Sequence, residues 1–312
     1  MTLRSVLIAV AAIFIAIRCY VATPQGFTSD EQRSFGAALL DFDPYGHQPP
    51  PPAYPAYVAA GRLLNFFIRD PRVTLFALSF ASAIVGFILF AISFGDLLRA
   101  PLLGIAASFL LYVSPPVRFL CAHATPEPLA FALVAAALVL QLRGRTLAFA
   151  VILASAAAVR PQMSVALLAL LLVARPGWKA IAAFLVALAV AFEPVIEAIG
   201  FDRFDLYVKS IPSPHDAPLA LPLHQFVIEP WGRATLVMFA AAIAGAIVCA
   251  LRRNAAGLPI GAFTIVHLLF ASVAATRVES VRPLVPALIG VSFFATAALS
   301  WSRRWTSPPS RS

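Results

Sequence analysis

The sequence predicts an all-α polytopic membrane protein with about ten transmembrane helices, a partly helical first outer loop and no soluble domain. Composition is the first reason, because 61% of the 312 residues are hydrophobic, only 12% are charged and the mean hydropathy is +0.89. Soluble domains carry about 25% charged residues, so this chain has too few to cover a surface in water. The other two reasons are the recurrence of long apolar runs and the placement of the charges.

Apolar runs recur from one end of the chain to the other. A membrane-crossing helix needs about 20 mainly apolar residues for a hydrocarbon core of about 30 Å. We expect ten such runs, at residues 3–22, 73–95, 101–120, 124–142, 146–159, 162–174, 180–200, 234–251, 258–276 and 284–301. None shows the alternating pattern of a membrane β-barrel strand. We therefore expect one transmembrane domain over residues 1–302 and a cytoplasmic basic tail over 303–312.

The first run, residues 3–22, is interpreted as a retained span. Cleavage of a signal peptide requires small side chains before the cut, and the available site ends at Ala22. Tyr20 occupies the critical position before that site, so its large side chain disfavours processing.

Charges separate between alternate loops when the N-terminus is placed in the cytoplasm. The cytoplasmic side then receives one acid, Asp96, and eleven basic residues, which are Arg4, Arg99, Arg143, Arg145, Arg175, Lys179, Arg252, Arg253, Arg303, Arg304 and Arg311. An excess of Arg and Lys in short cytoplasmic loops orients membrane proteins. We therefore expect both termini in the cytoplasm and two long outer loops, residues 23–72 and 201–232. Sidedness explains the net charge of +9 better than nucleic-acid binding does.

The start of the first outer loop is the most polar part of the chain. Residues 23–57 hold four of the fourteen carboxylates. Asp30 and Glu31 follow the first span by a few residues, so the backbone ties them to the membrane surface, where a carboxylate can accept a proton from an incoming hydroxyl. The alternative is that Ser29 or Asp30 only caps the helical segment that follows.

The later part of this loop carries a different set of signals. Asp41 and Asp43 are expected to shape the turn that leads into Pro44, and the proline run 49–52 favours an extended, rigid segment. The nearby His47 orients a sugar hydroxyl or bonds to the backbone beside the prolines, and His123 leaves the same two interpretations open.

Arg160 and Pro161 divide the apolar stretch 146–174 into two short runs. Each run of about 13 residues reaches only about 20 Å, and proline breaks a helix, so Arg160 is expected below the outer surface. An arginine at that depth faces a partner or a wet cavity. Further arginines are expected at the outer helix ends, namely Arg18, Arg118, Arg277 and Arg282. A guanidinium suits phosphate, and the alternatives are snorkelling to lipid headgroups or pairing with the outer acids.

The order of these features resembles the GT-C superfamily of polyprenyl-phosphate-sugar-dependent glycosyltransferases. The matching order is one span, an outer Asp-Glu pair, the segment SFGAALLDF, the stretch DFDPYG…PPPPAYPAY and then many spans. Further matches are HATPEPLAFALVAAALVL at 123–140, VRPQ at 159–162 and RPLVPAL at 282–288. The superfamily includes the protein mannosyltransferases, the aminoarabinose transferase of lipid A and bacterial cell-envelope mannosyl- and arabinosyltransferases.

The resemblance implies an inverting hexosyl- or pentosyltransferase of the cytoplasmic (inner) membrane. Its donor would be a polyprenyl-phosphate-linked sugar, and its acceptor a glycan, glycolipid or protein at the outer, periplasmic face. Asp30 would be the general base, and Glu31 would share or orient that role. Glu127 would lie near the sugar, and Arg160 and Arg282 would hold the lipid phosphate. The remaining candidates for substrate or lipid-phosphate binding are Arg118, His47 and Tyr54.

Two other functions stay open, a transporter or flippase of a lipid-linked sugar and a non-catalytic GT-C-like assembly subunit. Transporters place ionisable residues near the midplane in two related halves, whereas the acids of this chain gather at one face. The expected cofactor is the lipid-linked donor, a requirement for a divalent cation stays open, and no protein metal site is expected. His215, Asp216 and His224 are of ligand type, but they lack the regular spacing of metal ligands on a helix.

Overall fold

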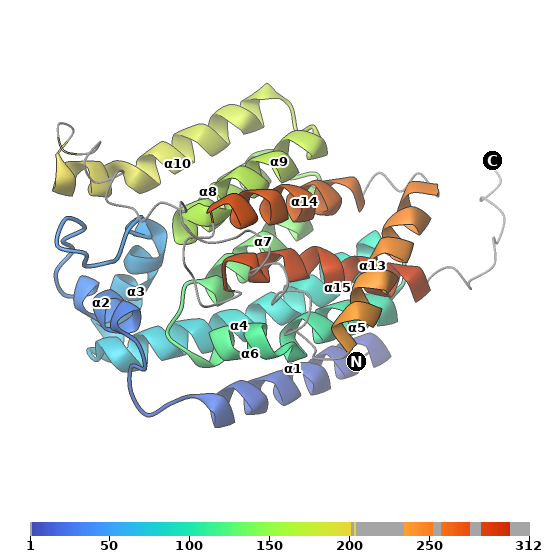
Figure 1. The fold of residues 1–312 in the computed structure, drawn as a ribbon, viewed down its shortest axis with the longest axis horizontal. Coiled ribbons are helices and arrows are strands. Elements are labelled where there is room, and N and C mark those ends of the chain that lie inside the picture. The colour runs from blue at the N-terminus through green and yellow to red at the C-terminus, as the bar shows by residue number, and fades with distance from the viewer. Residues whose placement is uncertain (1, 201–202, 204–233, 252–256, 275–281, 300–312) are drawn as a thin grey trace.

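The computed structural model describes residues 2–200, 203, 234–251, 257–274 and 282–299. Helices make up nearly all of the regular structure in these ranges, beside one isolated bridge between Asp43 and Gln48. The helices are α1 (Leu3–Ala22), α2 (Asp30–Ala38), α3 (Pro55–Ile68), α4 (Pro71–Leu97), α5 (Pro101–Val113), α6 (Pro115–Ala122), α7 (Glu127–Leu142), α8 (Thr146–Val159), η1 (Pro161–Met163), α9 (Ser164–Ala174), α10 (Trp178–Ile199), α13 (Ala234–Leu251), α14 (Gly257–Ala274), η2 (Arg282–Ala287) and α15 (Leu288–Leu299). The long helices form a bundle with α1 and α10 on opposite sides, and α2 and α3 lie at one end (Figure 1).

The apolar helices correspond one for one to the ten predicted runs. Three of them, α1, α4 and α10, are long and apolar enough to cross a membrane singly, and α5 with α6 makes a fourth span as a bent pair. Six shorter apolar helices complete the set, at Glu127–Leu142, Thr146–Val159, Pro161–Ala174, Leu236–Leu251, Gly257–Leu269 and Leu284–Leu299. Large apolar side chains such as Val10 (60% exposed) and Val190 (67% exposed) cover the outside of the bundle, as a lipid solvent requires. The prediction of a polytopic helical membrane protein is confirmed.

The predicted run 101–120 is not one straight helix. α5 ends at Val113, α6 begins at Pro115, and the two helices are bent by 71° at Ser114. A residue that precedes proline avoids the helical region, and proline is well tolerated at the first helical position. The Ser114 ψ of 133° fits the first rule, and Pro115 fits the second. The bend turns the chain toward the 123–126 segment that precedes α7.

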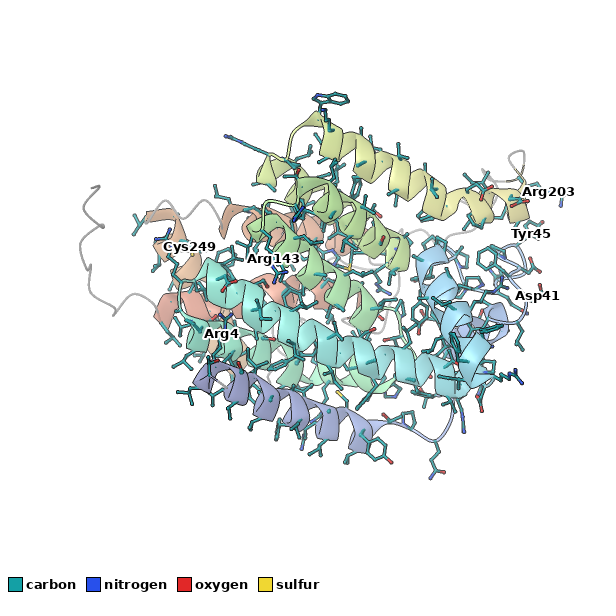
Figure 2. All side chains as sticks on the ribbon, turned by 180° about the vertical axis from the view of Figure 1, so that it is seen from behind. Arg4, Asp41, Tyr45, Arg143, Arg203 and Cys249 are labelled. Atoms are coloured by element: carbon teal, nitrogen blue, oxygen red, sulfur yellow. The ribbon has the colours of Figure 1, made fainter. Side chains whose placement is uncertain are left out.

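The polar first loop and the short arginine-bearing loops lie toward opposite ends of the bundle. Arg4 and Arg143 lie toward one end, whereas Asp41 and Tyr45 lie at the opposite end (Figure 2). We call the second end the loop end, because it carries residues 23–54. The short arginine-bearing loops and the polar first loop are therefore separated along the bundle, as the charge pattern predicts.

The first loop is partly helical, as predicted. Ser29 is the cap of α2, since its Oγ accepts a hydrogen bond from the Gln32 N–H at 3.3 Å. Asp30 is then the first residue of the helix rather than its cap. The Asp43 carboxylate accepts a hydrogen bond from the Gly46 N–H at 2.9 Å, so it shapes the turn as expected.

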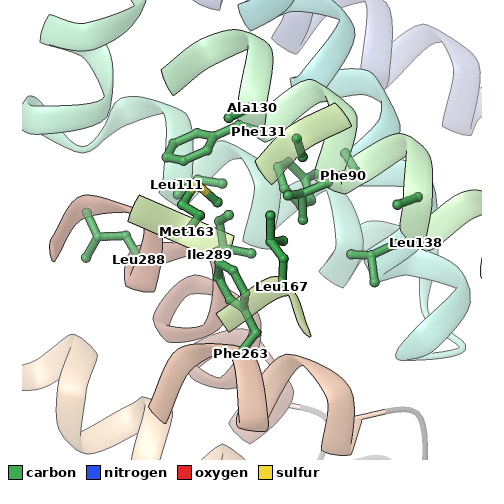
Figure 3. Close-up of a cluster of buried hydrophobic side chains, with 14 of the residues drawn as sticks. Phe90, Leu111, Ala130, Phe131, Leu138, Met163, Leu167, Phe263, Leu288 and Ile289 are labelled. Carbon is green, nitrogen blue, oxygen red and sulfur yellow. The ribbon is translucent and has the colours of Figure 1, made fainter. Parts of the chain in front are cut away.

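The hydrophobic core surrounds the break between α8 and α9. Met163 of η1 is fully buried, as are Leu111 of α5 and Leu167 of α9 (Figure 3). Phe131 of α7 and Ile289 of α15 lie in the same cluster (Figure 3). The break is therefore built into the packed centre of the bundle, and the residues next to it are held in place from several helices.

Candidate active site

A buried ion pair between α7 and the end of α8 forms the centre of the candidate site. The Arg160 Nη1 lies 2.7 Å from the Glu127 Oε1, and the two side chains are 5% and 0% exposed. Arginine and glutamate are rarely buried unless they are paired. Sequence reasoning selected both residues for the site, and the structure brings them into direct contact.

The helix break explains the position of Arg160. α8 ends at Val159, and Arg160 has φ −134° and ψ 82°, a conformation outside the helical region, as expected before proline. Pro161 then begins η1, and the Arg160 carbonyl accepts a hydrogen bond from the Met163 N–H at 2.9 Å. The predicted break at Arg160 and Pro161 is confirmed.

A hydrogen-bonded turn holds Glu127 at the start of α7. The Thr125 N–H donates to the Ser79 Oγ at 3.3 Å, and the Ser79 hydroxyl donates to the Thr125 carbonyl at 3.1 Å. The Thr125 hydroxyl also donates to the Leu120 carbonyl at 2.9 Å. A carboxylate in the first turn of a helix is stabilised by the partial positive charge there. Sequence reasoning missed Ser79, whose only signal was a polar side chain inside the apolar run 73–95.

The polar groups around the pair retain hydrogen-bonding capacity. The Arg160 Nε is buried and has no hydrogen-bond partner in the described part of the chain, and the same holds for the Gln162 Oε1. A buried donor or acceptor left unpaired costs about 1–3 kcal/mol. Beside the helix break, one buried donor and one buried acceptor are therefore left without a partner among the described residues.

Tyr54 connects the first loop to the helix break. The Gln162 Nε2 donates a hydrogen bond to the Tyr54 Oη at 2.8 Å. Tyr54 is buried, and its ring meets Phe35 of α2 edge-on with the ring centroids 5.1 Å apart. Its φ of 46° is in the left-handed region, which is uncommon for a non-glycine residue. The proline-rich segment thus ends on a tyrosine that packs on α2 and touches the residue following Pro161.

Asp30 lies on the surface of the loop end. Its side chain is 96% exposed, and its Oδ1 lies 2.5 Å from the Nη1 of Arg33. The spacing of three residues places the two side chains on one face of α2, so this partner was detectable from the sequence. Glu31 is half-buried beside Asp30. The ionic partner of Asp30 in this structure is Arg33 and not Arg160.

His47, Arg118 and Arg282 are the remaining predicted site residues. His47 is exposed, and its carbonyl accepts a hydrogen bond from the Ser34 hydroxyl. Arg118 is half-buried on α6 and lines a cavity together with Arg18. Arg282 is the first residue of η2, and its side chain lies outside the described residues.

His123 lies in the described part of the chain, whereas the candidate metal ligands do not. The His123 Nδ1 lies 2.7 Å from the Phe119 carbonyl oxygen, and the two rings stack with centroids 3.9 Å apart. His123 therefore bonds to the backbone, which was one of its two interpretations. The candidate ligands His215, Asp216 and His224 lie outside the described residues. Within the described ranges, no three His, Cys, Asp or Glu side chains gather as metal ligands would.

Comparison with known proteins identifies the fold. No protein-family model and no curated protein sequence matches the chain. The structure is similar to the crystal structures of ArnT, a GT-C aminoarabinose transferase, from Cupriavidus metallidurans, in the apo state (TM-score 0.62) and bound to undecaprenyl phosphate (TM-score 0.64). Identity is 14% in both comparisons, which cover 95% of this chain but only 59% and 60% of the ArnT chains. The chain therefore has the fold of a GT-C glycosyltransferase, over about three fifths of the length of ArnT.

Proposed function

We propose that the chain is an integral-membrane glycosyltransferase that moves a sugar from a polyprenyl-phosphate donor to an acceptor hydroxyl at the outer face of the cytoplasmic membrane. The observation that carries this proposal is the buried Glu127–Arg160 pair at a helix break, which the Tyr54–Gln162 hydrogen bond connects to the carboxylate-bearing first loop. Similarity to a transferase crystallised with undecaprenyl phosphate supports the donor class.

We assign the lipid phosphate of the donor to Arg160. Glu127 fixes the guanidinium through Nη1, and the buried Nε–H has no partner among the described residues, so it is a donor for a phosphate oxygen. In the reaction, the bond between the anomeric carbon and the phosphate oxygen breaks, and negative charge grows on the departing phosphate. A positioned guanidinium stabilises that charge more strongly in the transition state than in the bound donor, which lowers the barrier. Arg282 is the second expected phosphate ligand.

We assign the general base to Asp30. The acceptor oxygen attacks the anomeric carbon from the face opposite the phosphate, the carboxylate takes the hydroxyl proton, and the configuration inverts. Glu31 shares or orients this role. In the structure Asp30 pairs with Arg33 in the open, and an exposed ion pair is worth only about 0–1 kcal/mol, so substrate binding can displace it. We assign Tyr54 and His47 as the loop residues that contact the sugar or acceptor.

Turnover by the purified protein in detergent tests this proposal. Polyprenyl-phosphate-linked hexoses and pentoses are supplied with candidate acceptors, and release of polyprenyl phosphate is measured. Asp30→Asn is expected to lower turnover by about 10²–10⁴-fold, the usual range for a lost acid–base group. Arg33→Gln, which removes only the exposed partner, is expected to retain turnover within a few-fold.

Two outcomes would count against the proposal in different ways. Normal turnover by Asp30→Asn would exclude Asp30 as the base while leaving the transferase activity in place. Absence of turnover by the wild type with every donor, together with movement of a lipid-linked sugar across liposomes, would favour the flippase, since transport requires two compartments and transfer does not.

A further inference from the structure

We propose that the seam between α1, α5 and α6 binds one phospholipid with a phosphate headgroup, in a site separate from Arg160. The headgroup would occupy a cavity of about 250 Å³ that is lined by Arg18 and Arg118. One acyl chain would occupy an apolar groove of about 430 Å³ between α1 and α5. This inference does not depend on the transferase activity, because it uses no donor, acceptor or catalytic carboxylate.

The headgroup cavity combines two guanidinium groups from different helices. Arg18 lies just before the last turn of α1, which ends at Ala22, and Arg118 comes from the short helix α6 beyond the 71° bend. Tyr112 of α5 lines the same cavity, although its buried hydroxyl lies against Gly86 of α4. Arginine side chains present a planar set of donors that matches the oxygens of a phosphate. Their position near the end of a span is where a lipid phosphate lies.

Arg18 and Arg118 form no ion pair with a carboxylate among the described residues. By contrast, Arg4 near the other end of α1 is paired with Asp96 at 3.4 Å. Two guanidinium groups that line one cavity repel each other, and an anion between them converts that repulsion into attraction on both sides. The charge of the cavity therefore calls for an anionic ligand.

The apolar groove lies on the same face of α1 as Arg18. It is lined by Leu7, Val10 and Phe14 of α1 and by Ile105 and Phe109 of α5, among other apolar side chains. Residues spaced by three or four positions share one face of a helix, so the row that begins at Leu7 leads to Arg18. The rise from Leu7 to Arg18 is about 16 Å, which is close to half of a hydrocarbon core of about 30 Å. That is the depth to which one acyl chain extends in a leaflet.

Phe14 joins the two hollows. It lines both the headgroup cavity and the apolar groove, and its ring centroid lies 5.6 Å from that of Phe109 across the seam. A single ligand that passes Phe14 would place a phosphate between the arginines and a hydrocarbon tail along α1. A soluble anion would leave the groove empty, and a neutral lipid would leave the arginines without a counter-charge. A phosphate carried on a hydrocarbon chain satisfies both parts.

Native mass spectrometry of the purified protein tests this site. The detergent-solubilised chain is titrated with phosphatidylglycerol, with diacylglycerol, which has the same tails but no phosphate, and with inorganic phosphate. The wild type is expected to retain one phosphatidylglycerol and to bind the other two far more weakly. Arg18→Gln/Arg118→Gln is expected to lower phosphatidylglycerol affinity by about tenfold or more, because charge-assisted hydrogen bonds are lost. Arg143→Gln/Arg145→Gln, which neutralises two exposed arginines on the α7–α8 loop, is the matched control and is expected to bind like the wild type.

A second variant tests the tail groove, and a further arm separates the lipid sources. Phe14→Trp keeps both arginines but narrows the junction, and it is expected to weaken phosphatidylglycerol while leaving inorganic phosphate unchanged. Tighter retention of undecaprenyl phosphate than of phosphatidylglycerol, lost in the double arginine variant, would overturn the phospholipid assignment and identify the carrier lipid as the occupant. Equal phosphatidylglycerol binding by the wild type and the double variant, with both folded by thermal unfolding, would overturn the proposal. Equal retention of diacylglycerol and phosphatidylglycerol would also overturn it. The phosphatidylglycerol arm contains no sugar donor, so failure of the transferase proposal would leave its outcome unchanged.

Discussion

Glu127 and Arg160 are almost completely buried, at 0% and 5% exposure, whereas Asp30 and Arg33 form an ion pair that is 96% and 64% exposed. The two pairs contain the same chemical groups in opposite environments. A buried charge depends on its partner, because water does not replace a partner that is removed. An exposed charge loses little free energy when its partner is removed, because water solvates the charge instead.

Neutralising one acid in each pair should therefore give very different losses of stability. Glu127→Gln leaves the Arg160 guanidinium buried without a counter-charge, and we expect it to lower the free energy of unfolding by roughly 3–5 kcal/mol. Asp30→Asn is the matched change in the exposed pair and is expected to cost less than about 1 kcal/mol. Unfolding each variant by heat or by denaturant in the same detergent measures the two losses of stability. Equal losses would show that the Glu127–Arg160 contact does not hold the helix break together.

Sequence reasoning could select these residues but could not pair them. Asp30 and Arg33 are three residues apart on one helix, so their contact follows from helix geometry alone. Glu127 and Arg160 lie on different helices, and the sequence contains several other arginines at outer helix ends. Only the packing of α7 against α8 decides which arginine reaches Glu127.

At the scale of helices, proline and serine residues predicted a helix break and a helix cap correctly, whereas the apolar pattern alone did not predict where a run bends. Pro161 predicted the break after α8, and Ser29 was one of two predicted caps for α2. The apolar run 101–120 extends across the bend at Ser114, and the sequence signal for the bend was the pair Pro115-Pro116. An apolar composition indicates that a segment can lie in lipid, whereas the direction of a helix depends on local backbone chemistry.

The crossing of α4 and α5 depends on two glycines. A Cβ built on Gly104 would lie 2.1 Å from the Gly95 nitrogen, so the two backbones are in direct contact. Gly104→Ala should force the helices apart and lower the free energy of unfolding by about 1–3 kcal/mol, as overpacking does. Gly26→Ala is the control, because a Cβ there meets no atom within 4 Å. Thermal unfolding measures the stability of the two variants. Equal stability of Gly104→Ala and Gly26→Ala would contradict the close crossing of α4 and α5.

Across the whole molecule, hydropathy and charge placement predicted the recurrence of apolar helices and the separation of the polar loop from the arginine-bearing loops. These two features follow from lipid as a solvent and do not require a particular packing. The arrangement of the helices does require packing, and the sequence alone does not specify it. The similarity to ArnT at 14% identity indicates that the same arrangement is compatible with very different side chains.

A structure of the protein with a bound polyprenyl-phosphate sugar tests the assignment of Arg160 most directly. We predict that the lipid phosphate lies within hydrogen-bond distance, about 3 Å, of the Arg160 guanidinium, while Glu127 remains paired with it. We also predict that the sugar lies between this phosphate and the Asp30 side of the first loop. A lipid phosphate bound only between Arg18 and Arg118, with Arg160 contacting Glu127 alone, would contradict the assignment.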